Sequence, residues 1–352
     1  MIVKSRAPLR LGLGGGGTDT LPYCELYGGY VLNATIGMYA YAILEDSPDG
    51  RLRFHATDRN ERFETAATPH LPVDGLLDLH KGVYNRIVRD FNGGRPLPVT
   101  LTTFSDALAG SGLGSSSTMV VCMIQAYAEA LNLPLGEYDI AQLAYDIERI
   151  DLALSGGKQD QYAATFGGFN FIEFHSGNRV IVNPLRIKPW VLSELEMRIV
   201  LYYTGVSRES SRIIDEQTRN IEKGSTGSLE AMHALKEEAV IMKECLLKGE
   251  LGRFARSLDS SWNRKKDLSS SISNDHIERI YNGAKSSGAL AGKISGAGGG
   301  GYFMFFVDYE HRVRLIDYLE SLGQGKVVNC RFTPHGAMSW RLPSSGNDGL
   351  RP

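Results

Sequence analysis

The chain has 352 residues, of which 42% are hydrophobic and 22% charged, and its formal net charge is −2. This composition is typical of a globular protein, and the small net charge offers no general attraction to nucleic acid or to an acidic membrane surface. The length predicts two domains. Four cysteines lie far apart without a Cys-x-x-Cys pair, which argues against a zinc ribbon or a disulfide framework and favours a reducing, cytoplasmic location. No apolar run is long enough to predict a signal peptide or a membrane span.

A glycine-rich loop follows the first predicted strand. Leucines alternate with other residues over 9–13, which predicts a half-buried strand with Arg10 on the face opposite the leucines. A run of four glycines, 14–17, then leads to a hydroxyl and a short carboxylate, a combination suited to a polyhydroxylated ligand that approaches bare backbone. A simple capped turn is the alternative. The expected ligand-binding residues of this loop are Gly15, Gly16, Thr18 and Asp19.

The same loop formally matches a dinucleotide-binding pattern. Gly12, Gly14 and Gly17 satisfy G-x-G-x-x-G. However, Pro8 interrupts the preceding strand, and the acidic residue expected about 20 positions further on is missing, since Asn33 lies there. A dinucleotide fold is therefore the weaker hypothesis.

A second glycine-rich loop lies between a predicted strand over 99–104 and a predicted buried helix over 119–131. The free N–H groups and the dipole at a helix N-terminus favour a bound anion, and glycines let phosphates approach the backbone. A plain serine N-cap is the alternative. No Lys follows the glycines, so the Walker pattern is absent, as are the H-R-D and D-F-G motifs of protein kinases. The predicted phosphate loop consists of Gly110, Ser111, Gly112, Leu113, Gly114, Ser115, Ser116 and Ser117.

Polar residues gather at the end of the next predicted helix. Apolar residues follow helical spacing over 140–154, and Glu148 lies on the flank of that stripe. A double glycine at 156–157 ends the helix, and Lys158 and Asp160 follow it directly. Sites are often built at such element boundaries, although an exposed polar loop is the alternative.

The second half begins near residues 184–189 and contains further hydroxyl-rich and glycine-rich segments beside predicted strands. A predicted strand over 197–203 leads through the hydroxyl-rich segment 204–211, which includes Arg208, into a helix; the segment is suited to an anion, with ordinary capping as the alternative. The basic run 263–268 is predicted to be a solvated helix end. A third glycine-rich loop, 293–301, precedes a strand and is a further candidate for close phosphate approach.

Three glycine loops with hydroxyls, an acid on a helix and an Asp beside a Lys together indicate phosphoryl transfer, which depends on positioning and electrostatics. Pro8 with Arg10, the loop 110–117 and the segment 293–301 resemble, in order, the three motifs of the GHMP kinase superfamily. The resemblance covers nearly the whole chain. It implies an α+β fold with an S5-like N-terminal α/β domain (1–187), a ferredoxin-like C-terminal domain (188–342) and a site between them. The remaining residues, 343–352, are expected to form a loose tail.

The resemblance also implies roles for individual residues. Asp160 would accept the proton of the substrate hydroxyl, and Arg10 would keep that carboxylate ionised. Ser116 and Glu148 would bind Mg²⁺, and ATP would be the phosphoryl donor. The third loop would shape the site through Gly296 and Gly298.

Within the superfamily the chain looks most like the D-glycero-D-manno-heptose 7-phosphate kinases, through segments 6–10, 14–19, 157–162 and 204–208. This implies a sugar phosphate as the second substrate, with Lys158 and Arg208 as substrate-binding cations and no nucleic acid or membrane partner. The Gly-Glu-His stretch of galactokinases is missing, which argues against galactose. Two alternatives stay open: a fucokinase-like enzyme for a neutral sugar, and a non-catalytic regulator that binds sugar and nucleotide.

Overall fold

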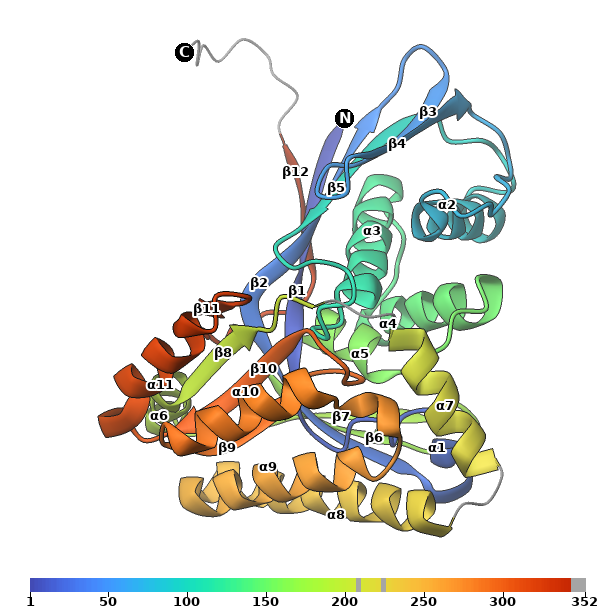
Figure 1. Ribbon diagram of the computed structural model, residues 1–352. Helices are drawn as coiled ribbons and strands as arrows, with labels where there is room; N and C mark the ends of the chain where they lie inside the picture. The colour runs from blue at the N-terminus through green and yellow to red at the C-terminus, as the bar shows by residue number, and fades with distance from the viewer. Residues whose placement is uncertain (207–209, 223–225, 343–352) are drawn as a thin grey trace, which may run out of the picture.

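The computed structural model describes residues 1–206, 210–222 and 226–342 (Figure 1). Its larger sheet runs in the order β12-β1-β2-β5-β3-β4, with β6 and β7 attached to the other end of β2. All strand pairs in it are antiparallel except β3 with β5. The strands are β1 (Ile2–Gly14), β2 (Gly29–Asp46), β3 (Arg51–Ala56), β4 (Glu61–Ala66), β5 (Val99–Ser105), β6 (Phe169–Phe174), β7 (Val180–Pro184) and β12 (Met338–Leu342).

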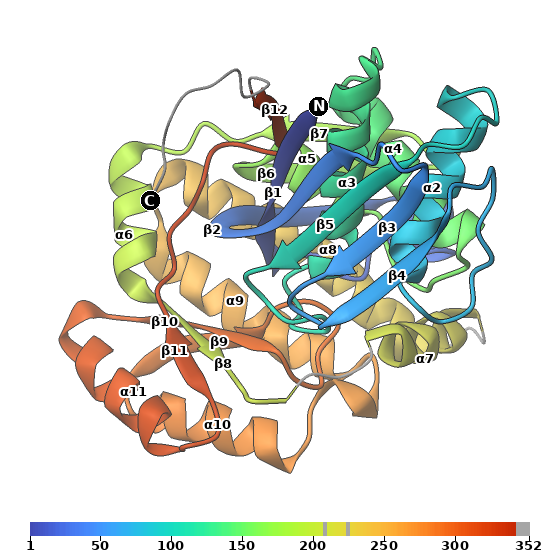
Figure 2. The same ribbon diagram turned by 90° about the horizontal axis from the view of Figure 1, so that it is seen from above.

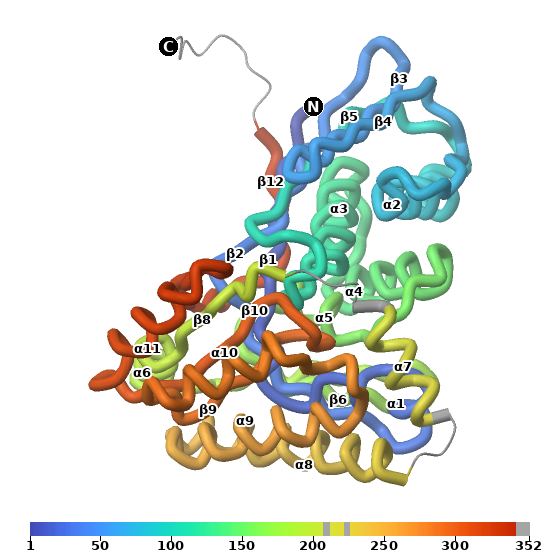
Figure 3. The backbone as a smooth tube through the Cα atoms, viewed as in Figure 1, coloured from blue at the N-terminus to red at the C-terminus, as the bar shows by residue number. Residues whose placement is uncertain are grey.

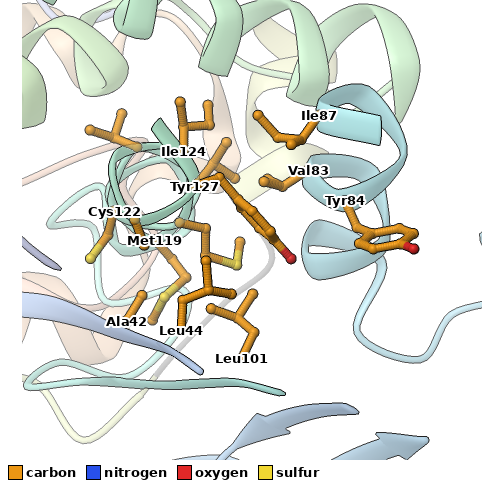
Figure 4. Packing of buried hydrophobic residues seen from close by; sticks show 14 of the residues in the cluster. Ala42, Leu44, Val83, Tyr84, Ile87, Leu101, Met119, Cys122, Ile124 and Tyr127 are labelled. Atoms are coloured by element: carbon orange, nitrogen blue, oxygen red, sulfur yellow. The ribbon is translucent and has the colours of Figure 1, made fainter. Parts of the chain in front are cut away.

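Helices pack against this sheet on one face (Figure 2). They are α2 (Asp78–Phe91), α3 (Ser115–Leu131), α4 (Glu137–Asp146) and α5 (Gln159–Phe166), while the short α1 (Tyr23–Tyr27) precedes β2. The predicted apolar helix is α3, and it is buried on nearly every side because it lies between the sheet and α2. Figure 4 shows Met119 and Tyr127 of α3 among side chains of the sheet and of α2, including Leu44, Leu101 and Val83.

The smaller sheet is antiparallel, in the order β11-β8-β10-β9. Its strands are β8 (Ile199–Tyr203), β9 (Ala289–Ile294), β10 (Tyr302–Val307) and β11 (Lys326–Val328). Helices α10 and α11 lie beside it in Figure 1, and α9 packs against β9. The helices of this half are α6 (Pro189–Arg198), α7 (Ser210–Glu222), α8 (Thr226–Lys248), α9 (Leu251–Lys266), α10 (Asp275–Ser286) and α11 (Tyr309–Ser321), with a short 3₁₀ turn at Ser270–Ile272.

One apolar core joins the two sheets. Leu9 and Leu11 of β1 and Leu32 of β2 belong to the same buried cluster as Met242 of α8 and Met304 of β10. Burial of such side chains is the main stabilising contribution to a fold. The two halves are therefore held together by shared packing. Side chains from both halves can be kept at fixed positions where the halves meet.

The mixed α+β fold predicted from the sequence is confirmed, while several predicted boundaries shift. The strand expected over 197–203 begins at Ile199, because α6 continues to Arg198. The sequence interpretation missed β12, which returns to the first sheet and pairs with β1 next to the N-terminus, as the tube in Figure 3 shows. The division at 187/188 stays a prediction, and the tail 343–352 lies outside the described residues.

The dinucleotide hypothesis is wrong. A dinucleotide fold needs a parallel strand–helix–strand unit after its glycines. Here β1 pairs antiparallel with β2, and only the short helix α1 lies between them. Among the described helices, none combines the length and apolar character that crossing a membrane requires.

Candidate active site

A cavity of about 590 Å³ lies where the glycine loops of the two halves meet. Its wall combines segments that are far apart in the sequence: β1, the first two glycine loops, the segment 148–157 after α4, the start of α5, α7, α9 and the third glycine loop. Many of the residues in this wall carry polar or charged side chains. They are Arg10, Asp19, Thr20, Ser115, Ser116, Ser117, Glu148, Arg149, Ser155, Gln159, Asp160, Gln217 and Lys265.

The second glycine loop leads directly into the N-terminus of α3. Gly112 and Gly114 adopt left-handed backbone conformations, with φ of 80° and 76°. A Cβ atom on Gly112 would lie 2.2 Å from the carbonyl oxygen of Ser295, so the close approach of the second and third loops requires glycine there. Gly110, Gly112, Gly114 and the three serines of the first helical turn line the cavity, where free N–H groups suit phosphate oxygens.

Two predicted members of this loop lie outside the wall of the cavity, and their contact with a ligand stays a prediction. The carbonyl oxygen of Ser111 accepts a hydrogen bond from the Tyr302 amide at 3.0 Å, which ties the loop to β10. Leu113 is fully buried in the core that joins the two sheets. Both residues anchor the loop, and their neighbours face the cavity.

Glu148 lies beside the phosphate loop on a distorted helical turn. The turn Ile147–Asp151, which continues α4, is a π-helix, a geometry common at functional sites. The Glu148 side chain is 1% exposed, and its Oε1 accepts a hydrogen bond from Ser116 Oγ at 3.2 Å. Gln161 donates to its other oxygen and, at 3.1 Å, to Ser117. The paired oxygens of Ser116 and Glu148 are the kind of ligands that Mg²⁺ prefers, so this site fits the predicted metal.

A buried arginine, Arg10, forms an ion pair with the partly exposed Asp160 in the wall of the cavity. Arg10 Nε and Nη2 lie 2.7 and 2.6 Å from the same carboxylate oxygen, Asp160 Oδ1. Arg10 Nη1 donates to the carbonyl oxygen of Gly112 at 2.6 Å, so the guanidinium is fixed against the phosphate loop. Among the described residues no hydrogen bond or ion pair involves Asp160 Oδ2, which leaves that oxygen to accept a proton from a ligand hydroxyl.

The first glycine loop places Asp19 opposite this pair. Thr18 Oγ1 donates to the backbone oxygens of Gly15 and Tyr30, at 2.8 and 2.9 Å, and fixes the loop against β2. The Asp19 carboxylate accepts hydrogen bonds from the amides of Gln159 (2.9 Å) and Gly17 (3.2 Å). Burial raises the pKa of Asp19, and the nearby charge of Asp160 acts in the same direction.

Four residues predicted to contact a ligand also lie outside the wall of the cavity, so their contact stays a prediction. Gly15, Thr18 and Gly298 do not line it: Thr18 and Gly15 hold the first loop against Tyr30, and Gly298 packs on Ile272. Lys158 is also absent from the wall, because its Nζ donates to Asn178 at 2.7 Å and lies 5.1 Å from the centre of the Tyr145 ring. Gly16, Asp19 and Gly296 do line the cavity. The predicted Arg208 lies outside the described residues.

Sequence reasoning missed several residues of the wall. Lys265, in the run predicted to be solvated, is 4% exposed and lines the cavity. Gln217 of α7 is 7% exposed, and its Nε2 has no hydrogen-bond partner among the described residues. Gln159 and Arg149 also reach the wall. Helical periodicity marks the apolar face of such helices, so an isolated polar residue aimed inward gives no local signal.

Comparisons with known proteins show the family of this chain. Residues 78–168 match the model of the GHMP kinases N terminal domain, and residues 242–324 match that of GHMP kinases C terminal. The D-glycero-alpha-D-manno-heptose 7-phosphate kinase of Campylobacter jejuni is 52% identical over 340 residues, covering 97% of this chain and 99% of that protein. The crystal structure of a D-glycero-D-manno-heptose 1-phosphate kinase from Bacteroides thetaiotaomicron superposes with a TM-score of 0.84 at 44% identity, covering 97% of this chain and all of that one.

A more distant relative is the L-fucokinase/L-fucose-1-P guanylyltransferase of Bacteroides fragilis, 27% identical over 342 residues, which cover 89% of this chain and 35% of that protein. The chain belongs to the GHMP kinase family and is an ATP-dependent sugar kinase.

Proposed function

We propose that this enzyme phosphorylates the anomeric hydroxyl of D-glycero-D-manno-heptose 7-phosphate to give the 1,7-bisphosphate, which would feed nucleotide-heptose and surface-glycan synthesis in the cytoplasm. The observation that carries the proposal is the 52% identity, over 97% of the chain, to a D-glycero-alpha-D-manno-heptose 7-phosphate kinase. The Arg10–Asp160 pair in the wall of the cavity would supply the chemistry.

In the proposed reaction, the anomeric oxygen attacks the γ-phosphorus of ATP. The bond from that phosphorus to the β–γ bridging oxygen breaks, ADP leaves, and the hydroxyl proton passes to Asp160 Oδ2. Arg10 holds Asp160 through Oδ1 and so orients the second oxygen toward the hydroxyl. Asp19, Gln159 and Gln217 would bind the other sugar hydroxyls, since all three line the cavity.

The phosphate side of the cavity would hold MgATP. Backbone N–H groups of the second glycine loop would bind phosphate oxygens, and Ser116 with Glu148 would hold Mg²⁺. When bound, the metal supplies positive charge that offsets the negative charge of the phosphates. The remaining steps depend on residues of the chain itself, which orient the hydroxyl and remove its proton.

The two heptose kinases named above differ in the phosphate that their substrate carries before transfer, at position 7 in one name and at position 1 in the other. Either substrate would give the same bisphosphate. A coupled ADP-release assay over heptose 7-phosphate, heptose 1-phosphate, mannose 6-phosphate, fucose and galactose tests the choice. We expect turnover with heptose 7-phosphate to exceed that with every other acceptor, and ³¹P NMR to locate the new phosphate on the anomeric oxygen.

Two other outcomes would replace the proposal. Preference for fucose would favour a fucokinase-like enzyme, the alternative suggested by the 27% identity to L-fucokinase/L-fucose-1-P guanylyltransferase. Binding of sugar and ATP without turnover of any acceptor would indicate a regulator. The presence of both Glu148 and Asp160 in the cavity argues against that second alternative, because a binding protein needs no proton acceptor.

A further inference from the structure

Two adjacent lysines at the end of α9 lie in opposite surroundings. Lys265 is 4% exposed, lines the cavity, and donates a hydrogen bond from Nζ to the carbonyl oxygen of Gly296 in the third glycine loop. Lys266 is partly exposed, and its Nζ forms a salt bridge with Glu278 at 3.1 Å. Helix α9 therefore directs one cation into the site and the next one away from it.

The Lys265 ammonium is buried without a carboxylate partner. Among the described residues none forms an ion pair with it, although Asp19 and Asp160 lie close enough to raise its pKa. Arg10 on β1 and Lys293 on β9 face it with like charge. Burial and the charge of Arg10 together lower the pKa of Lys265 to about 8. A buried, unpaired cation is costly, so its retention beside a ligand cavity indicates that an anion enters there.

The surroundings of Lys265 point to the reacting group. Its partner Gly296 packs directly against Gly112 of the phosphate loop, and Arg10 bridges Gly112 and Asp160. If Asp160 accepts the proton of the attacking hydroxyl, the γ-phosphorus lies within about 3.5 Å of that hydroxyl oxygen in a reactive geometry. The γ-phosphoryl oxygens then lie in the region between the second and third loops.

We propose that Lys265 Nζ binds a phosphoryl group in the reacting complex, as a second cation beside Arg10. The inference rests on the proposed reaction. The γ-phosphoryl group of ATP is the source favoured by the contact with Gly296, while the phosphate already carried by the acceptor has the same chemistry. A cation at the transferred group would stabilise charge on its oxygens during transfer.

The test compares Lys265→Met, Lys265→Arg and the control Lys266→Met. Methionine keeps the length and the apolar stem of lysine, and arginine keeps the charge. We expect Lys265→Met to lower kcat about 100-fold, Lys265→Arg to recover at least about tenfold of that loss, and Lys266→Met to stay within about twofold of the parent. Circular dichroism and thermal unfolding verify that each variant folds.

Binding measurements identify the source of the phosphoryl group without turnover. If Lys265 contacts the γ-phosphoryl group, Lys265→Met weakens binding of a non-hydrolysable ATP analogue about tenfold and leaves binding of ADP unchanged. If it contacts the phosphate of the acceptor, the variant instead loses about tenfold in affinity for mannose 6-phosphate and none for mannose. Calorimetry with the full-length protein gives all four constants.

A pH profile adds a readout that a purely structural lysine would not move. The parent enzyme should lose kcat/KM as the pH rises through about 8, because the free enzyme then loses the Lys265 proton. In Lys265→Arg this alkaline decline should disappear. A Lys265→Met variant whose kcat and whose four binding constants stay within about twofold of the parent would overturn the inference. Absence of turnover in the parent would instead count against the proposed reaction, and the binding constants would still decide the role of Lys265.

Discussion

The two sides of the cavity are built in different ways. The side that we propose for the phosphates comes mainly from one continuous stretch, Gly110 to Ser117, with Glu148 added from the π-helical turn. The side that we propose for the sugar combines single residues from separate elements: Asp19 from the first loop, Gln159 from α5 and Gln217 from α7. Asp160 from α5 and Lys265 from α9 line the cavity where the two sides meet. The phosphate side relies on backbone N–H groups and helix geometry, whereas the sugar side relies on side chains held in position by packing.

This difference has a consequence for variation within the fold. A loop that binds phosphates through its backbone tolerates few changes, because a side chain on Gly112 would collide with Ser295. Side chains on separate helices can be exchanged one at a time without moving the loop. We therefore expect substitutions on the phosphate side to change nucleotide binding, and substitutions on the sugar side to change acceptor selectivity. The following predictions test that separation.

The largest expected effect is at Asp160, where the two sides meet. Asp160→Asn should lower kcat about 1,000-fold or more, because the amide cannot accept the hydroxyl proton, while the Kd for MgATP changes by less than about threefold. Steady-state kinetics and calorimetry measure the two quantities. Asp90→Asn, at a surface ion pair, is the matched control. Equal losses in kcat and in ATP affinity would contradict the role of Asp160 as proton acceptor.

The next effect concerns Glu148, which belongs to the phosphate side alone. Glu148→Gln keeps the shape and removes the charge, so kcat at fixed Mg²⁺ should fall about 100-fold and recover in part at higher Mg²⁺. The Kd for the sugar should not change. Glu129→Gln, at an exposed pair with Arg341, serves as control. A Mg²⁺ titration that superposes on that of the parent would show that Glu148 is not a metal ligand.

The contrast between the two sides also explains what the sequence could predict. The phosphate loop was recognisable because glycines, serines and a following apolar helix are neighbours in the sequence and each has a direct physical meaning. Arg10 and Asp160 could be named as a pair only through the family resemblance, since 150 positions separate them along the chain. Their contact depends on how β1 and α5 pack, which local patterns do not encode.

Lys265 is a residue whose surroundings the sequence analysis predicted wrongly. By composition it belongs to a basic run at a helix end, and such runs are normally solvated. It is buried because the third glycine loop folds over the end of α9 and offers the oxygen of Gly296 as an acceptor. Lys158 shows the converse case. It lies two positions before Asp160 in the sequence and was therefore predicted to bind the substrate, yet its Nζ donates a hydrogen bond to Asn178. The strand β12 was missed because a short segment after a long connection carries little periodic signal.

A moderate effect is expected at Gln217, on the sugar side alone. Its Nε2 makes no hydrogen bond within the described part of the chain, so Gln217→Leu removes no hydrogen bond of that amide group and should leave thermal stability nearly unchanged. If Nε2 donates to a sugar hydroxyl, KM for the acceptor should rise about tenfold with kcat within about threefold. Gln125→Leu, outside the cavity, is the control. A rise in KM for ATP instead would place Gln217 on the phosphate side.

The smallest effect on catalysis is expected at Lys158. Because its Nζ hydrogen-bonds Asn178 at 2.7 Å and lies over the Tyr145 ring, Lys158→Met should leave the acceptor KM within about twofold of the parent. The same change removes a cation–π contact worth about 1 kcal/mol, so the unfolding temperature should fall by about 1–2 °C. Thermal unfolding and steady-state kinetics separate the two roles, since a substrate-binding lysine would raise KM and a structural one lowers Tm. A tenfold rise in KM at unchanged Tm would restore Lys158 to the sugar side and would extend that side beyond the wall of the cavity.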